Sequence, residues 1–143
     1  MTLSVSMIEK HSDMHAVFLQ GMPCALFRLV GKKLLEEGAR VTRVNICPGD
    51  WLFWHNENSI NFKGYLRDWP DFIETMFCKQ GVTDLVLLGE QRDYHKEAVT
   101  IAHRLGIRVS VTDFGYLRPD WITFERDGMG GNSRFPKSPE DVL

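Results

Sequence analysis

Hydrophobic positions along the chain fall into two alternating patterns. Short apolar runs, some with β-branched residues at every second position, predict parallel strands at residues 15–19, 40–46, 83–88 and 108–112. Apolar residues recur at helical spacing over residues 25–34, 69–77 and 96–105. Strands that alternate with helices are typical of an α/β domain, so the pattern predicts a parallel sheet with crossover helices.

Residues 50–68 break the alternation, because tryptophan, phenylalanine and tyrosine lie there among Asn, His, Gly and Lys. We expect a long aromatic loop. Loops of this length are uncommon in compact domains unless they bind or cover a ligand. A flap whose aromatic side chains cap the core fits the composition equally well.

The length of 143 residues predicts one domain. The 17 basic and 19 acidic side chains leave no net positive charge for nucleic acid, which we exclude as a partner. No apolar run approaches the roughly 20 residues of a membrane-spanning helix, and no signal-peptide pattern opens the chain, so we expect a cytoplasmic protein.

Two further features limit the chemistry. Cys24, Cys47 and Cys78 are odd in number and widely spaced, which predicts buried free thiols rather than a disulfide framework or a metal site. The chain also lacks a phosphate-binding P-loop, a dinucleotide fingerprint and a zinc-protease motif. We therefore expect no metal and no cofactor.

Polar residues gather where the second, third and fourth predicted strands end. Parallel strands share a carboxyl edge, where open α/β sheets bind their ligands. One cleft would then collect Asp50, Glu90, Arg92, His95, Asp113 and Arg118. Carboxylates beside arginine and histidine suit acid–base or nucleophilic chemistry at a sugar or phosphate centre.

Each of these residues also has a structural interpretation. Asp50 fits a helix or turn cap, Arg92 a solvated surface charge, and His95 the start of a helix. Asp113 lies beside a glycine at a strand exit, where an Asx-turn is the alternative to catalysis. Arg118 precedes a proline, which favours an extended backbone and suits either an anion contact or a brace for the loop.

Five blocks of the sequence resemble those of the capsule polysaccharide biosynthesis and export proteins of the KpsS/LipB type, in the same order. They are residues 18–21, 49–54, 83–87, 92–95 and 115–123. Together they span nearly the whole chain.

The resemblance implies a retaining transferase that moves Kdo from CMP-Kdo onto a phosphatidylglycerol-type lipid and so begins the capsule linker. Such enzymes resemble GT-B glycosyltransferases with two Rossmann-like domains, the second of which holds most of the nucleotide. Residues 1–143 resemble only the first, a single Rossmann-like α/β domain. Residues 126–143 would begin an incomplete following segment.

The resemblance also implies roles for individual residues. Where many relatives have Glu-Glu-Gly-Tyr, this chain has Asp113 followed by Phe114, so the role of acid or nucleophile passes to Asp113. Glu90 or His95 would assist proton transfer.

Substrate binding would fall to the remaining residues of the cleft. Arg92 and Arg118 would orient the anionic sugar or the acceptor phosphate, and Trp51 with Trp54 would face the lipid. The other substrate-binding residues implied are Asp50, Gly115 and Tyr116.

Capsule assembly proteins and the inner face of the cytoplasmic membrane are the partners that the resemblance implies. The alternative is a non-catalytic fragment or binding module that recognises an anionic lipid or glycan within the capsule machinery.

Overall fold

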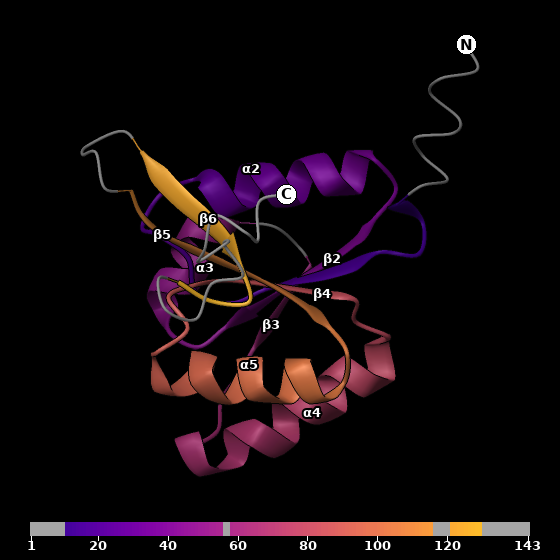
Figure 1. Cartoon of the computed structure of the whole chain (residues 1–143), viewed down its shortest axis with the longest axis vertical. Coiled ribbons are helices and arrows are strands. Elements are labelled where there is room, and N and C mark those ends of the chain that lie inside the picture. Colours follow the sequence, from indigo (N-terminus) through magenta and orange to yellow (C-terminus); the bar gives the residue numbers. More distant parts are fainter. Residues whose placement is uncertain (1–10, 56–57, 116–120, 130–143) are drawn as a thin grey trace, which may run out of the picture.

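The computed structural model describes residues 11–55, 58–115 and 121–129 (Figure 1). Their core is one six-stranded sheet in the order β3-β2-β1-β4-β5-β6. The strands are β1 (His15–Phe18), β2 (Arg40–Asn45), β3 (Ser59–Asn61), β4 (Asp84–Leu88), β5 (Arg108–Phe114) and β6 (Ile122–Arg126). The first five run parallel, and β6 pairs antiparallel with β5. The predicted α/β fold with a parallel sheet is confirmed, and its strand order is Rossmann-like.

Helices cover both faces of the sheet (Figure 1). They are α2 (Leu26–Glu36), α3 (Pro48–Trp54), α4 (Trp69–Gln80) and α5 (Asp93–Arg104), with a short 3-10 turn, η1 (Leu66–Asp68). Helices α4 and α5 lie together on one face, while α2 and α3 lie on the other. The layers are those of a doubly wound fold.

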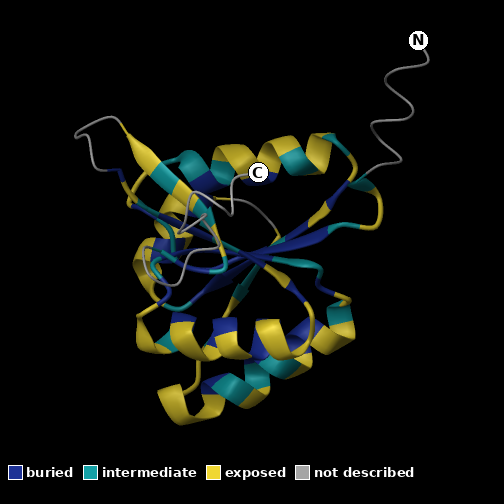
Figure 2. Cartoon of the chain, in the orientation of Figure 1, coloured by how far each residue is buried: buried dark blue, intermediate teal, exposed yellow. Residues whose placement is uncertain are grey.

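Strand β1 shows how the sequence pattern divides the core. Val17 and Leu19 pack toward α4 and α5, whereas Ala16 and Phe18 pack toward α2 and α3. Because successive side chains of a strand point to opposite faces, one apolar run serves both layers. Figure 2 shows the result as buried positions that line both sides of the sheet.

Residues 50–68 are not the long loop expected from the sequence. The segment holds most of α3, strand β3 and η1. Pro48 stands in the first turn of α3, and His55 ends the helix with a left-handed φ of 53°. Two turns of helix are too short to show a hydrophobic period, so the sequence pattern did not reveal them.

Strand β6 was not predicted either, because residues 122–126 resemble a continuation of the connection that follows the fourth predicted strand. Its side chains alternate between exposed and half-buried, and its apolar residues Ile122 and Phe124 lie on the exposed side instead of facing a core. A short edge strand with only two apolar residues is difficult to tell from a loop by its sequence.

The prediction of buried thiols was wrong, since all three cysteines are exposed. Cys24 and Cys47 precede the helices α2 and α3 in the turns after β1 and β2, and Cys78 lies on α4. Their free state agrees with the expectation from their number. Two of them lie in turns and the third lies on the exposed side of a helix, so none follows the general preference of cysteine for cores.

Candidate functional site

The carboxyl edge of the sheet contains the point where the strand order reverses. Strands β1 and β4 are neighbours there, and the chain leaves them toward helices on opposite faces. Rossmann-like sheets bind ligands at such a reversal.

A side-chain contact joins the two strand exits at this point. The guanidinium of Arg92, after β4, donates to Oε1 of Gln20, after β1. The amide of Gln20 also approaches Sγ of Cys47, after β2, at 3.7 Å. Gln20 therefore links three strand exits, a role that sequence reasoning missed because one glutamine after a strand carries no motif.

A cavity of about 510 Å³ opens beside this contact, at the exits of β4 and β5. It is lined by Gly89, Glu90, Gln91, Arg92, Asp113 and Met129. The structure thus brings together three of the residues expected in the cleft, two carboxylates and one arginine.

The two carboxylates of this cavity are held differently. Glu90 is 8% exposed, and its Oε1 accepts a hydrogen bond from the backbone amide of Met129 at 3.1 Å. Asp113 is half-buried, and its Oδ1 accepts from the amide of Phe114 at 2.7 Å. The second contact is local and leaves Asp113 at the cavity wall.

His95 is almost completely buried in the first turn of α5, with 1% of its surface exposed. Its Nδ1 lies 2.8 Å from the carbonyl oxygens of both Leu88 and Gly89. Carbonyls only accept, so Nδ1 carries a proton, and in the neutral ring Nε2 carries the lone pair. Nε2 has no hydrogen-bond partner among the described residues.

Burial lowers the pKa of His95, because desolvation disfavours the charged ring. The two carbonyl contacts oppose this shift, Arg92 adds to it, and Asp50 opposes it. His95 is therefore neutral at pH 7, and Nε2 can accept a proton but has none to give.

Asp50 serves as a helix cap, the structural alternative considered for it. Its Oδ2 accepts hydrogen bonds from the amides of Ile46 at 2.8 Å and Cys47 at 3.1 Å. Its Oδ1 lies 3.3 Å from Nη2 of Arg43 in an ion pair that is almost fully buried. Burial lowers the pKa of Arg43, and the carboxylate of Asp50 partly offsets that shift. With its contacts satisfied inside the protein, Asp50 stands apart from the cavity at Glu90 and Asp113.

The two tryptophans of α3 point to different environments. Trp54 is 1% exposed and packs against Phe18 at a ring distance of 5.4 Å and against Gly31 of α2. Trp51 is 53% exposed. Of the two residues expected to face a lipid, only Trp51 presents its indole to solvent.

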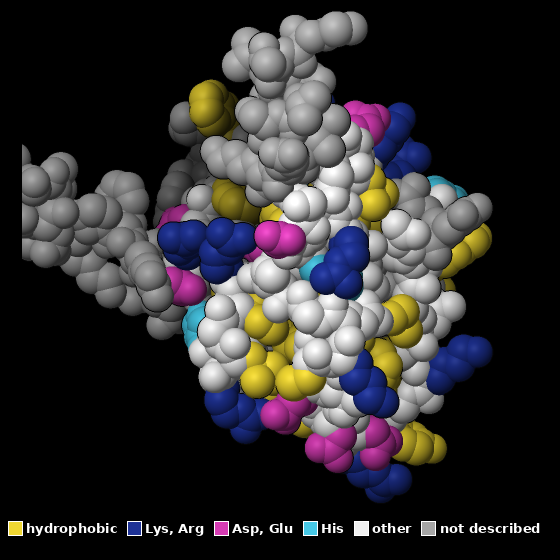
Figure 3. Space-filling model, turned by 90° about the vertical axis from the view of Figure 1, so that its right-hand side faces the viewer, with side chains coloured by type: hydrophobic (Ala, Val, Ile, Leu, Met, Phe, Trp, Pro, Cys, Tyr) yellow, Lys and Arg dark blue, Asp and Glu magenta, His cyan; other side chains and the backbone are white. Residues whose placement is uncertain are grey.

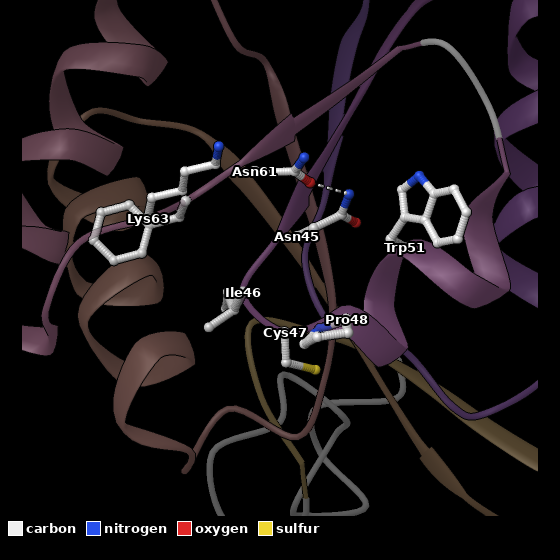
Figure 4. Close-up of a pocket in the computed structure, with 8 residues that line it drawn as sticks. Asn45, Ile46, Cys47, Pro48, Trp51, Asn61 and Lys63 are labelled. Atoms are coloured by element: carbon white, nitrogen blue, oxygen red, sulfur yellow. Dashed lines mark hydrogen bonds between the residues drawn. The ribbon is translucent and has the colours of Figure 1, made fainter.

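Trp51 also lines a second cavity, of about 380 Å³, at the exits of β2 and β3. Its other lining residues are Asn45, Ile46, Cys47, Pro48, Asn61, Phe62 and Lys63 (Figure 4). Sequence reasoning missed Asn45, Asn61 and Lys63 because β3 itself was not predicted.

The expected substrate-binding residues after β5 are only partly described. Gly115 is buried, and its amide donates to the carbonyl of Trp121 at 2.8 Å. A Cβ at Gly115 would meet the backbone of Trp121 at 2.6 Å, so close packing requires glycine there. Tyr116 and Arg118 lie outside the described residues.

The amino edge of the sheet has a different character. Figure 3 shows the side of the molecule where the parallel strands begin, with basic and acidic side chains interspersed. Some of them are paired, as Arg108 is with Asp84 at 2.8 Å. This edge offers no field of one sign to a charged ligand.

Residues 11–55, 58–115 and 121–129 were compared with the geometry of metal sites and of membrane-spanning helices. No cluster of three or more His, Cys, Asp or Glu side chains there is arranged to hold a metal ion. None of the helices in these ranges has the length and apolar character needed to cross a membrane.

Comparison with solved structures gives a weak likeness. A SAM dependent methyltransferase from Aquifex aeolicus aligns with 99% of this chain and 71% of its own, at 10% identity and a TM-score of 0.41. A likeness of this degree says nothing about the reaction.

Comparison with known sequences is more informative. Residues 83–143 match the model of the capsule polysaccharide biosynthesis protein family. The Escherichia coli capsule polysaccharide export protein KpsS is 27% identical over 87% of this chain. The Neisseria meningitidis capsule polysaccharide modification protein LipB, from serogroup A, is 27% identical over 89% of it. The chain spans about a third of the length of these curated relatives, 32% and 31% respectively. The chain is a distant homologue of KpsS and LipB over most of its length, and its residues 83–143 match the capsule polysaccharide biosynthesis protein family.

Proposed function

We propose that this chain is the N-terminal Rossmann-like domain of a capsule transferase that moves Kdo from CMP-Kdo onto a phosphatidylglycerol-type lipid. The observation that carries the proposal is the cavity at the carboxyl edge, where Glu90, Arg92 and Asp113 meet in a chain whose residues 83–143 match the capsule family model. Both the place in the fold and the residue types suit sugar transfer.

Asp113 is the carboxylate that acts on the sugar. As the anomeric bond to CMP breaks, CMP leaves with the bonding electrons and positive charge develops on the ring. A carboxylate beside the anomeric carbon stabilises that charge or forms a covalent bond to it. Asp113 is the less buried of the two carboxylates in the cavity, so its oxygen is the more accessible to a substrate.

Arg92 and His95 assist this step. The guanidinium of Arg92 orients the anionic group of the sugar or of the acceptor, in competition with its contact to Gln20. The acceptor hydroxyl gives up its proton as it attacks. Glu90, or the lone pair on Nε2 of His95, receives that proton.

The lipid acceptor places the protein at the inner face of the cytoplasmic membrane, as a peripheral partner of other capsule assembly proteins. Trp51, Leu52 and Phe53 support this placement, because three successive side chains of α3 expose apolar surface beside the carboxyl edge. Apolar side chains exposed together mark a contact surface.

The experiment uses the polypeptide as the cell makes it, isolated through a tag on the chromosomal copy. It is incubated with CMP-Kdo and lysophosphatidylglycerol, and the lipid is analysed by mass spectrometry. We expect one added Kdo, and its loss in Asp113→Asn with the fold unchanged. Near-normal turnover in that variant would remove Asp113 from the mechanism.

One observation favours a second function, that of a binding module for an anionic lipid or glycan. Asp50 and Glu90 both direct carboxylate oxygens at backbone amides, as supporting residues do. If the wild-type protein binds the lipid but adds no Kdo to it, the binding module is favoured over the transferase.

A further inference from the structure

The cavity at the exits of β2 and β3 contains a chain of hydrogen bonds that determines its polarity. Nε of Arg43 donates to Oδ1 of Asn45 at 3.3 Å, and Nδ2 of Asn45 donates to Oδ1 of Asn61 at 2.9 Å (Figure 4). Asn45 is 3% exposed, so its amide is fixed within the protein. These hydrogen bonds lead from a buried cation to the cavity wall.

The chemistry of the side chains decides which atom donates and which accepts in each of these hydrogen bonds. A guanidinium has only donors, so the atom of Asn45 that faces Arg43 is its oxygen. The nitrogen of Asn45 then faces Asn61, whose oxygen must accept. Nδ2 of Asn61 is left as the outer group, and Asn61 therefore presents a donor to the cavity.

Lys63 adds a second donor, with a full positive charge. It lies two residues after Asn61 and lines the same cavity. In Figure 4 its ammonium group extends on the same side of Asn45 as Asn61. Lys63 forms no ion pair within residues 11–55, 58–115 and 121–129, and none of the described residues of the lining is acidic. Two donors with no competing carboxylate suit an oxyanion.

Trp51 forms the other side of the cavity. Its indole is 53% exposed and lies across the asparagine pair from Lys63 in Figure 4. Ile46, Pro48 and Phe62 complete a mainly apolar lining. An exposed aromatic face opposite two donors suits a ligand with a ring at one end and an anion at the other.

We propose that this cavity is an anion-binding site for a ring-bearing carboxylate or phosphate. The oxyanion accepts hydrogen bonds from Nδ2 of Asn61 and Nζ of Lys63, and the ring stacks on Trp51. The site lies at the exits of β2 and β3, so it is separate from the cavity at Glu90 and Asp113. This inference goes beyond the proposed function, and binding at the site requires no catalytic turnover.

The test is direct binding to the ¹⁵N-labelled chain, observed by NMR at constant ionic strength. The probes are glucuronate, glucose 6-phosphate and neutral glucose, so the first two separate carboxylate from phosphate. The Asn61 side-chain amide and the Trp51 indole N–H are expected to shift and saturate with at least one anionic probe, but not with glucose. Shifts that appear equally with glucose, or that stay absent from both groups, overturn the proposal.

Variants in the cavity, each matched to a control variant elsewhere, test whether the anionic probe binds at Asn61 and Lys63. Asn61→Asp replaces the donor with a carboxylate, and Asn58→Asp makes the same charge change three residues earlier, in the lining of a cavity at the amino edge. Lys63→Gln is paired with Lys79→Gln, which also lies in that lining. None of the four side chains is buried, so the fold is expected to survive each change.

The expected result is a clear difference between the pairs. Asn61→Asp and Lys63→Gln weaken binding of the anionic probe by about tenfold or more, since each removes a charge-assisted hydrogen bond. Asn58→Asp and Lys79→Gln change it by less than about twofold, because exposed charges at this separation are screened. Equal weakening in site and control variants, or shifts that never saturate, would mean an adventitious ion only and would overturn the proposal.

Discussion

Arg43 and Asp50 form an ion pair inside the protein, with Nη2 and Oδ1 3.3 Å apart and both side chains at most 4% exposed. The pair joins strand β2 to helix α3, which carries Trp51 to one cavity of the carboxyl edge. Arg43 also donates to the carbonyl of Leu19. One buried charge pair thus connects β1, β2 and α3 where the strands end.

Neutralising Asp50 is predicted to destabilise the protein. Asp50→Asn leaves the guanidinium of Arg43 buried without its counter-charge, which typically costs about 3–5 kcal/mol. Urea unfolding measures the free energy of unfolding. The control Asp13→Asn removes the same charge from an exposed side chain and is expected to cost less than about 0.5 kcal/mol. Similar losses in the two variants would show that the ion pair is not buried as described.

The neutral state of His95 is a second prediction. Burial lowers its pKa, so the folded protein keeps Nδ1–H and an unprotonated Nε2 at pH values where the same side chain in the unfolded protein, with its ordinary pKa of 6.5, takes up a proton. Long-range ¹H–¹⁵N spectra distinguish the two ring nitrogens. A doubly protonated His95 in the folded protein at pH 6.5 would contradict the structure.

The lowered pKa of His95 also predicts how the free energy of unfolding depends on pH. The unfolded state binds more protons than the folded state below about pH 6.5, so the free energy of unfolding falls as the pH falls through that value. His15, whose pKa burial also lowers, contributes in the same direction. His95→Gln keeps a donor for the two carbonyls but does not titrate, so its stability is expected to vary less between pH 7 and 5. An unchanged pH dependence in that variant would count against the shift.

Gly31 is predicted to be required for the packing of α2. A Cβ at this position would lie 2.5 Å from Cη2 of Trp54. Gly31→Ala is therefore expected to destabilise the fold by about 1–3 kcal/mol through overpacking, although alanine is the better helix former by about 1 kcal/mol. The double variant with Trp54→Phe is expected to cost less than the sum of the single changes. Additive costs would show that the two residues do not meet.

Arg92 provides a test of function at the strand reversal. Arg92→Gln removes the charge and the bidentate geometry, and we expect transfer to fall by about tenfold or more with the fold intact. Arg104→Gln is the control, because this exposed arginine lies at the other end of α5. Initial rates of Kdo addition to the lipid measure both variants. Equal rates for Arg92→Gln and wild type would exclude Arg92 from substrate binding.

The parallel sheet and the crossover helices followed from the sequence because buried strands and amphipathic helices carry strong hydrophobic periods. Strand β4, from Asp84 to Leu88, is apolar at four of its five positions, and its helix α5 places Ala98 and Ala102 one turn apart. Both patterns are local. The turn at Gly106, with a φ of 73°, is likewise marked by a residue that tolerates that conformation.

The parts that were missed depend on contacts distant in sequence. Strand β3 is only three residues long and gains its hydrogen bonds from β2, so nothing near Ile60 marks it as a strand. The residues expected to share one cleft lie in separate environments for the same reason. Asp50 pairs with Arg43, a residue that stands among β-branched positions of β2 and gives no sign of binding a carboxylate.

The proposed function requires a ligand at the carboxyl edge, where β1 and β4 separate. The most direct test is the mapping of amide shifts in the ¹⁵N-labelled chain on titration with a short-chain lysophosphatidylglycerol below its critical micelle concentration. We predict saturating shifts at Gln20, Gly89 and Arg92. Shifts confined to the amino edge, around Arg40 and Lys79, would contradict a ligand site at the carboxyl edge.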